Sequence, residues 1–318
     1  MDAPLLLIDA ASLYFRAYYG VPESITAPDG TPVNAVRGFT DMVARLIELR
    51  HPRRLVVCLD LDWRPAFRVA AIPSYKAHRV AEQAGPGAPD VEEVPDTLSP
   101  QVPVILDVLA AIGLATAGAA GYEADDVIGA LAAAELRDPV EVITGDRDLF
   151  QVVRTEPTSA QVVYVGRGLA KAEVIGPTEL ATRYGLPEIG AGPAYADLAA
   201  LRGDPADGLP GVPGIGEKTA ATLISRFGSV EALLVALDEP HSALASGVRA
   251  KLRAARDYLE SAPGVVRVAI DAPVRQDRDD ALPSVPADPV RLKALQRTWG
   301  LGTAVDRLVA ALQRNADR

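Results

Sequence analysis

The chain has 318 residues, of which 49% are hydrophobic and 23% are charged, a balance typical of a globular protein with one large domain or one large and one small domain. The N-terminus lacks the basic segment of a signal peptide, no run approaches ~18 uninterrupted apolar residues, and a single cysteine excludes a disulfide framework, so we expect a cytoplasmic protein without a membrane span. The net charge of −10 argues at face value against nucleic acid as a partner, unless many of the acidic residues hold cations.

Three short apolar runs end in acidic residues. They lie in the segments PLLLIDAAS, where Asp9 follows the apolar run, RRLVVCLDLD, where Asp60 and Asp62 follow it, and VEVITGDRDLF, where Asp146 and Asp148 follow it. Each run has the length of a strand and no polar alternation, which is typical of strands buried on both faces of a parallel sheet. The helical patterns VNAVRGFTDMVARLIELR, PVILDVLAAIG and DDVIGALAAAELR separate the runs, so we predict an open α/β sheet with right-handed crossovers. Because ligands bind beyond the carboxyl ends of such strands, the acidic residues should meet in one crevice.

The segment GYEADDVIGALAAAE crowds three carboxylates into four positions, at Glu123, Asp125 and Asp126. One interpretation is that acidic residues complement the positive end of the helix dipole. The alternative, which we favour, is a metal site on the same side of the sheet, where some of the three contact the ion directly and others contact it through water. Clustered carboxylates repel one another without cations, and oxygen ligands without nearby cysteine or histidine select hard ions such as Mg²⁺ or Mn²⁺.

Residues 64–106 form an unusually long connection between a predicted strand and the next helix. Four basic residues, Arg64, Arg68, Lys76 and Arg79, cluster in its first part. Residues 84–103 are rich in proline, glycine and acids, a composition that indicates mobility. We interpret the connection as a lid or gateway beside the active site, and a disordered surface insertion is the alternative.

The segment GVPGIGEKTAATLI superficially resembles a phosphate-binding P-loop, but Glu217 stands where the lysine would be, and no strand precedes it. A helix-hairpin-helix motif fits better. Gly214 and Gly216 flank the apolar Ile215, which lets the backbone approach a phosphate, and the following helix presents free N–H groups to it. Such contacts position a duplex without reading its sequence. An ordinary glycine-rich turn between two helices is the alternative.

We predict three parts along the chain. Residues 1–190 form the α/β core with the insertion at about 64–104, residues 191–262 form the helix-hairpin-helix part, and residues 263–318 form a tail. In the tail, GVVRVAIDAPV reads as a strand, and DPVRLKALQRTWG and TAVDRLVAALQR read as helices that pack back onto the core.

Several of these motifs occur together in one order: LIDAASLYFRAYYG, CLD, SYKAHR, GYEADDVIGAL, ITGDRDLFQVV and GDPADGLPGVPGIGEKTA, followed by VVRVAIDAPV. In this combination the chain resembles the 5′ nuclease domain of bacterial DNA polymerase I and, more broadly, the flap endonuclease family. The resemblance covers roughly residues 4–275. It implies a PIN-like 5′ nuclease core with a helix-hairpin-helix subdomain, here as a stand-alone protein.

The resemblance also assigns roles to individual residues. The implied metal ligands, of which the first five would centre on one ion and the last four on a second, are Asp9, Asp60, Glu123, Asp125, Asp126, Asp146, Asp148, Asp204 and Asp207. The implied residues near the scissile phosphate are Arg16, Tyr75, Lys76 and Arg79. The implied DNA contacts are Tyr14, Gly214, Ile215, Gly216, Lys218 and Thr219. Relatives also hold a potassium ion through backbone carbonyls, which here would be those of Gly211, Val212, Gly214 and Gly216.

Setting the nine implied ligands aside leaves acidic and basic residues nearly equal in number, so the net charge no longer argues against DNA. Two departures from the family remain. Gly208 stands where the family usually has an asparagine beside a metal ligand, which puts the support of Asp207 in doubt. The stretch 84–99 is less basic than many family arches, which puts its grip on a threaded strand in doubt.

The residues and the resemblance together predict a two-metal 5′ nuclease, with 5′→3′ exonuclease and 5′-flap endonuclease activities in replication or repair. We expect a monomer that acts on DNA with a 5′ flap or a 5′ end at a duplex junction. Three alternatives stay open: a PIN-type ribonuclease, a non-catalytic DNA-junction binder, and a metal-dependent phosphatase or receiver-like protein. The predicted duplex anchor argues against the first and third, and the full set of acidic residues argues against the second.

Overall fold

The computed structural model describes residues 3–83, 90–239 and 243–318. Among them, one seven-stranded sheet has the order β8-β7-β6-β1-β2-β5-β9, and β3 pairs with β4 separately. The strands are β1 (Leu5–Asp9), β2 (Arg54–Cys58), β3 (Val80–Glu82), β4 (Val91–Glu92), β5 (Ala115–Gly118), β6 (Val140–Thr144), β7 (Ala160–Tyr164), β8 (Glu173–Ile175) and β9 (Arg275–Gln276). The five strands from β7 to β5 are parallel, and β8 and β9 join the edges antiparallel. The open, mainly parallel sheet predicted from the sequence is confirmed.

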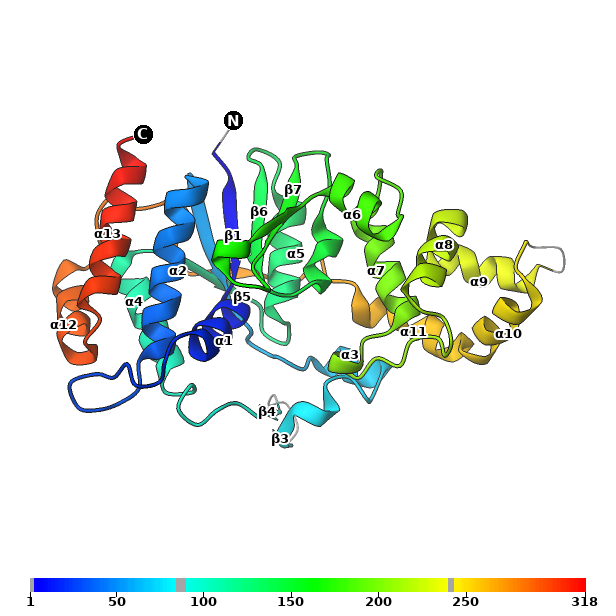
Figure 1. Ribbon diagram of the computed structural model, residues 1–318, viewed down its shortest axis with the longest axis horizontal. Helices are drawn as coiled ribbons and strands as arrows, with labels where there is room; N and C mark the ends of the chain where they lie inside the picture. The colour runs from blue at the N-terminus through cyan, green and yellow to red at the C-terminus, as the bar shows by residue number, and fades with distance from the viewer. Residues whose placement is uncertain (1–2, 84–89, 240–242) are drawn as a thin grey trace.

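Helices cover both faces of this sheet (Figure 1). They are α1 (Ala10–Gly20), α2 (Asn34–Arg50), α3 (Ala66–Ala71), α4 (Gln101–Ile112), α5 (Ala124–Ala134), α6 (Pro177–Tyr184), α7 (Ala191–Arg202), α8 (Glu217–Phe227), α9 (Val230–Asp238), α10 (Ser246–Ala254), α11 (Arg256–Val266), α12 (Pro289–Trp299) and α13 (Gly302–Ala316). Short 3₁₀ turns are η1 (Ala77–Arg79), η2 (Asp148–Val152), η3 (Leu169–Lys171) and η4 (Pro205–Asp207). The described part of the chain contains no single helix that is long and apolar enough to cross a membrane, although the bent pair α8 and α9 reaches that length and hydropathy together.

The strands are buried on both faces, as their continuous apolar runs predict. Along β1, Leu6 and Ile8 pack with α1, α2, α4, α12 and α13, whereas Leu5 and Leu7 pack with α5 and the elements that follow it. Alternate side chains of one strand therefore serve two helix layers. Packing on both faces holds the sheet in place, so the residues that follow the carboxyl ends of its strands have fixed positions.

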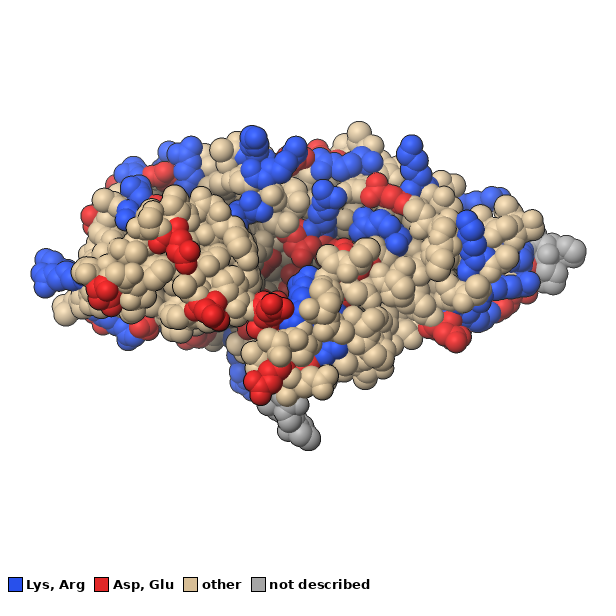
Figure 2. All heavy atoms as spheres, turned by 60° about the horizontal axis from the view of Figure 1, so that its bottom comes forward, with Lys and Arg blue, Asp and Glu red and all other residues tan. Residues whose placement is uncertain are grey.

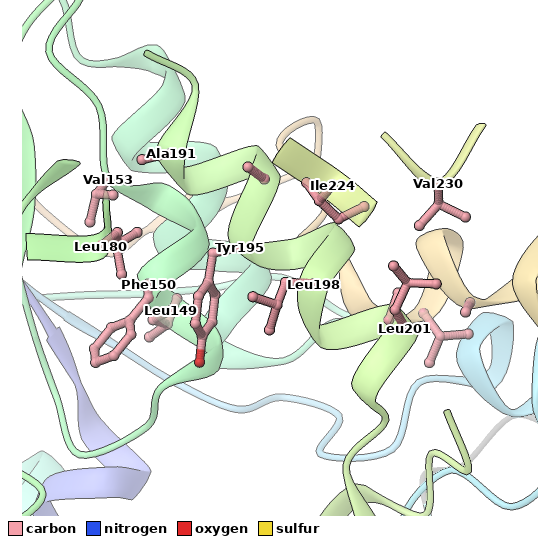
Figure 3. Packing of buried hydrophobic residues seen from close by; sticks show 14 of the residues in the cluster. Leu149, Phe150, Val153, Leu180, Ala191, Tyr195, Leu198, Leu201, Ile224 and Val230 are labelled. Carbon is pink, nitrogen blue, oxygen red and sulfur yellow. The ribbon is translucent and has the colours of Figure 1, made fainter. Parts of the chain in front are cut away.

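The apolar cluster that contains Leu5 and Leu7 continues from the sheet into α7, α8 and α9. Phe150 of η2 lies 5.4 Å, centroid to centroid, from Tyr195 of α7, and both rings are fully buried. Further along, Leu198 and Leu201 of α7 extend this packing toward Ile224 of α8 (Figure 3). The helix-hairpin-helix part is thus joined to the α/β core through one continuous apolar cluster, which fixes its distance from the sheet.

One prediction about the tail needs correction. Residues 264–266 are not in a strand but end α11, in which Leu259, Ala262 and Val265 are buried at helical spacing. The only tail strand described is β9, further along at Arg275–Gln276. The tail helices α12 and α13 do pack back, against α4 and α2.

The long insertion has more structure than its composition predicted. It contains α3, η1, β3 and β4, while residues 84–89 lie outside the described residues. Its last part packs on the core, because Leu98 is buried and the side-chain oxygen of Gln101 accepts a hydrogen bond of 2.8 Å from the Ala35 amide of α2. Residues 98–103 are therefore anchored, contrary to the mobility expected for the whole stretch 84–103.

Candidate active site

A cavity of about 690 Å³ opens at the carboxyl ends of β1, β2 and β6, between the sheet and the insertion. Figure 2 shows it as a hollow with acidic atoms in its depth and basic side chains at its rim. The acidic residues that line it are Asp9, Asp60, Glu92, Glu123, Asp125, Asp146, Asp148 and Asp204. The basic residues that line it are Lys76, Arg79, Arg147 and Arg202. Seven of the nine predicted ligands therefore meet here, and Asp126 and Asp207 do not line the cavity.

Neighbouring strands position the carboxylates at the cavity floor. Asp9 ends β1 and caps α1, where it accepts a hydrogen bond of 3.1 Å from the Ser12 amide. Its second oxygen accepts one of 2.7 Å from the hydroxyl of Thr144, which ends the adjacent strand β6. The same hydroxyl accepts from the Asp146 amide at 2.9 Å. Two strand ends thus share one hydrogen-bond chain that sets Asp9 and Asp146 side by side.

The start of α5 is tied to β2 in the same way. The carboxylate of Asp60 accepts a hydrogen bond of 2.7 Å from the Ala124 amide, one of the free N–H groups of the first helical turn. The acidic residues of this turn therefore complement the helix end, as the helix-dipole interpretation requires, and Asp125 also faces the cavity. The helix-end role is therefore seen directly, and the metal-binding role of this motif stays a prediction.

Burial and mutual repulsion raise the pKa values of Asp9, Asp125 and Asp148 in the cavity. Burial, followed by the charge of Asp60, raises the pKa of Asp9 to about 7. Burial, followed by the charges of Asp146 and Asp9, raises the pKa of Asp125 well above its usual range. Asp148 is shifted in the same direction by burial and by Asp146. A cation in the cavity would remove this repulsion.

This shift predicts a pH-dependent stability effect of Asp9. Because the folded pKa of Asp9 lies above the unfolded value of 3.8, folding is penalised increasingly as pH rises from about 4 to 7. We expect Asp9→Asn to raise the melting temperature of the metal-free protein at pH 8 and to raise it less at pH 5. Melting curves of both proteins in EDTA across this range measure the effect. A gain that does not shrink toward pH 5 would contradict it.

Asp126 and Glu123 are engaged from behind the cavity by Arg68 of α3, which is 2% exposed. The guanidinium of Arg68 donates to both oxygens of Asp126, at 2.7 and 2.9 Å, and it also pairs with Glu123. Asp126 accepts two further bonds, from the backbone amides of Glu123 and Ala269. The prediction that Asp126 is a direct metal ligand is therefore not supported by its position, because its carboxylate is buried and saturated with donors.

The predicted gateway residues lie at different depths. Tyr75 is buried, and its phenol donates a hydrogen bond of 2.6 Å to Glu123, so it supports the cavity wall and does not line the cavity. The ammonium of Lys76 lines the cavity and pairs with the other oxygen of Glu123. Arg79 lines the cavity too and pairs with Asp207 at 2.7 Å. Asp207 thus faces the gateway, and its predicted role as a metal ligand is not reflected in its position.

Two residues of α1 that the resemblance placed near the DNA also have defined positions. Arg16 does not line the cavity, and its guanidinium donates to the carbonyl of Gly166 at 2.8 Å while its buried Nε has no partner among the described residues. Tyr14 is partly buried, and burial followed by the charge of Asp60 raises its pKa. Its neighbour Phe15 lines the cavity. Of this aromatic segment, Phe15 is the residue that the structure brings to the site.

The helix-hairpin-helix turn has the expected form. Ile215 is buried, Gly214 has φ +76°, and the Val212 amide donates to the carbonyl of Leu201 at 2.9 Å, which closes the hairpin onto α7. Gly216 caps α8 without a side chain, so the first N–H groups of α8 have no side-chain cap, and Lys218 and Thr219 beside them are exposed. These features suit a phosphate.

Three of the four carbonyls predicted to hold potassium already accept hydrogen bonds. The carbonyl of Gly214 accepts a hydrogen bond of 2.8 Å from the ammonium of Lys251 in α10. Those of Val212 and Gly216 accept from the amides of Ile215 and Ala220. Each oxygen keeps a second lone pair, so the site can still take a cation, and potassium stays a prediction.

Sequence reasoning missed three charged residues and one tryptophan of the cavity wall. Arg147 lies between two predicted ligands, and Arg202 directly precedes the segment that holds Asp204, so proximity to these motifs could have identified both. Glu92 and Trp63 reach the wall from the insertion and from the segment after β2. No pattern in the sequence indicates the position of Glu92.

The donor set of the cavity suits hard divalent ions, since it consists of carboxylates whose repulsion a cation would relieve. Among the described residues, no group of three or more such side chains is already arranged around one point where it could hold an ion. Rotation of the side chains toward a shared ion is therefore part of any binding event.

Comparisons with known proteins agree with the fold. Residues 4–185 match the family described as 5′-3′ exonuclease, N-terminal resolvase-like domain, and residues 191–289 match that described as 5′-3′ exonuclease, C-terminal SAM fold. A 5′-3′ exonuclease of Mycobacterium tuberculosis is 58% identical over 313 residues, which are 98% of each chain. A 5′-3′ exonuclease of Streptomyces coelicolor is 54% identical and covers 96% of this chain and 99% of its own.

DNA polymerase I of Mycobacterium bovis is 36% identical over 78% of this chain, which spans only 26% of that polymerase. The solved structure of the T5 D15 protein co-crystallised with metal ions has a TM-score of 0.62 at 17% identity and covers 98% of this chain and 99% of its own. The catalytic core of Rad2 in complex with DNA substrate has a TM-score of 0.59 at 17% identity, with 98% and 92% covered. These two structures share the fold. By its family matches and its closely similar relatives, the chain belongs to the 5′-3′ exonuclease family.

Proposed function

We propose that this 5′-3′ exonuclease hydrolyses DNA at 5′ flaps and at 5′ ends beside a duplex junction, with Mg²⁺ or Mn²⁺ held in the carboxylate cavity. One observation carries the proposal: carboxylates from β1, β2, β6, α5 and the turn after α7 meet in a single cavity with basic residues at its rim. A protein that only binds DNA gains nothing from such a self-repelling pocket. When bound, two divalent ions supply the positive charge that activates water and stabilises the leaving oxygen.

The cavity residues of the chain would then have two roles. Asp9, Asp125, Asp146 and Asp148 hold the ions, and Asp60 and Asp204 complete the set from the opposite walls. Lys76 and Arg79 offset the negative charge that develops on the scissile phosphate, as other fixed cations do in phosphoryl transfer. Lys76 would have to exchange Glu123 for that phosphate, and Arg79 would have to exchange Asp207.

The duplex would be held at a distance by the hairpin turn. The uncapped start of α8 and the exposed Lys218 and Thr219 suit backbone phosphates, which are present in every sequence. Because α7 and α8 are packed into the same apolar cluster as the sheet, this anchor lies at a fixed distance from the cavity. Substrate choice would therefore follow DNA shape. A monomer in the cytoplasm, and a potassium ion at the hairpin, belong to the same proposal.

The test is cleavage of a labelled 5′-flap duplex by the purified protein with Mg²⁺, with Mn²⁺ and with EDTA. We expect incision at the base of the flap with either ion and none in EDTA, because the carboxylates alone carry no positive charge to activate water. Single-stranded RNA and a flap that is blocked at its 5′ end run in parallel. Tight flap binding without incision would support a DNA-junction binder, and cleavage of RNA alone would support a PIN-type ribonuclease.

A further inference from the structure

The gateway segment Ser74–Arg79 is docked onto the loop Asp204–Gly208. The hydroxyl of Ser74 donates to the carbonyl of Gly208 at 2.7 Å, and the Lys76 amide donates to the carbonyl of Asp207 at 2.9 Å. Arg79 adds two bonds from one nitrogen, to the carbonyl of Ala206 at 2.8 Å and to the carboxylate of Asp207 at 2.7 Å. Four hydrogen bonds thus join two segments that are more than a hundred residues apart in the chain.

Gly208 is the residue that makes this contact sterically possible. Its φ is +70°, in the left-handed region that other residues rarely adopt. A Cβ at this position would lie 2.0 Å from the carbonyl oxygen of Ser74, far inside van der Waals contact, and 3.4 Å from the Lys76 amide nitrogen. Because the obstacle is backbone, no side-chain rotation can relieve the clash. Any residue other than glycine would push the gateway segment off the loop.

The docked segment sets the positions of the two gateway cations. Lys76 itself has φ +46°, a strained conformation for a residue with a side chain. The hydrogen bond from its backbone amide to the carbonyl of Asp207 holds it in this conformation. With the backbone in this conformation, the ammonium of Lys76 and the guanidinium of Arg79 both line the cavity. If the segment undocked, both cations would move together, because they are only three residues apart.

We propose that Gly208 is a positioning residue: it lets the gateway dock on the loop beside Asp207, so that Lys76 and Arg79 are held over the cavity before DNA arrives. The departure from the asparagine that the family usually carries is then an adaptation of this chain, and it does not weaken the site. The role in catalysis rests on the proposed function of Lys76 and Arg79. The docking itself does not.

The test compares Gly208→Ala with Gly185→Ala, a matched control with the same φ of +70° and no atom within 4 Å of an added Cβ. Amide hydrogen exchange of residues 74–79 reports docking directly. We expect about tenfold faster exchange there in Gly208→Ala and no change in this segment in Gly185→Ala. Ser74→Ala, which removes one of the four bonds, should shift exchange in the same direction by less.

Single-turnover flap cleavage is the second readout. We expect the rate of Gly208→Ala to fall about 10- to 100-fold while the Kd for the flap changes less than twofold, since displaced cations affect the reaction more than binding. Unchanged exchange at residues 74–79 in Gly208→Ala would overturn the docking. Faster exchange with an unchanged cleavage rate would overturn the positioning role. If the wild type failed to cut DNA at all, the proposed function would fail, and the exchange comparison would still decide whether Gly208 holds the gateway.

Discussion

Replacing Asp146 with asparagine is expected to slow flap cleavage by about 10²–10³-fold, because one of the carboxylates that would hold the ions loses its charge. Asp146 follows β6, lines the cavity, and adds to the repulsion that raises the pKa values of Asp125 and Asp148. Asparagine has nearly the same shape as aspartate. Its side-chain oxygen can still accept the hydrogen bond of 2.9 Å that Asp146 accepts from the Asp148 amide. Single-turnover cleavage at saturating Mg²⁺ measures the loss.

The control for this loss is Asp107→Asn. Asp107 lies on α4, pairs with Arg291 and does not line the cavity, so its replacement should leave the cleavage rate within twofold. The affinity of Asp146→Asn for the flap should stay near that of the wild type or increase, since a negative charge near phosphate is removed. Cleavage by Asp146→Asn at the wild-type rate would contradict the assignment.

Arg68→Met is expected to lower the free energy of unfolding by about 3–5 kcal/mol, because it leaves the buried carboxylate of Asp126 without a counter-ion and removes one of the two cations that pair with Glu123. Arg68 also donates from Nε to the carbonyl of Val265 in α11 at 2.9 Å, so the insertion, α5 and α11 meet at this one side chain. Methionine has a similar length and no charge, which separates the loss of the ion pairs from the loss of volume. Urea unfolding followed by circular dichroism measures the change.

Arg307→Met is the matched control. Arg307 makes a bidentate contact with Asp41 on the surface, where both side chains are more than a third exposed, so its loss should cost less than about 1 kcal/mol. Adding Asp126→Asn to Arg68→Met should recover part of the stability, since it removes the buried charge that has lost its counter-ion. If Arg68→Met lowered the free energy of unfolding no more than Arg307→Met does, the buried ion pairs of Arg68 would not stabilise the fold.

The sheet and the meeting of its acidic residues were predictable because they depend on short-range patterns. Continuous apolar runs that end in acids define buried parallel strands, and parallel strands present their carboxyl ends at one edge. Asp9, Asp60 and Asp146 could therefore be placed together from spacing alone. The motif at Glu123–Asp126 was predictable as a helix start for the same reason.

What the sequence could not provide were the partners of each carboxylate across the fold. Arg68 reaches Asp126 over 58 positions, and Arg79 reaches Asp207 over 128. No local pattern distinguishes Asp125, which faces the cavity, from Asp126 beside it, which is buried behind it. The tail segment VVRVAI is rich in β-branched residues and reads as a strand, yet its first residues end α11, because helical burial of Leu259, Ala262 and Val265 overrides the local pattern.

The central claim is that the carboxylate cavity holds the divalent ions with which this 5′-3′ exonuclease cuts DNA. The most direct measurement is the anomalous scattering of Mn²⁺ in crystals prepared at a Mn²⁺ concentration that supports flap cleavage. The claim predicts anomalous peaks inside the cavity, within ligand distance of Asp125 and Asp146, and their loss in the Asp146→Asn variant. Peaks only outside the cavity, in a protein that cleaves under the same conditions, would contradict it.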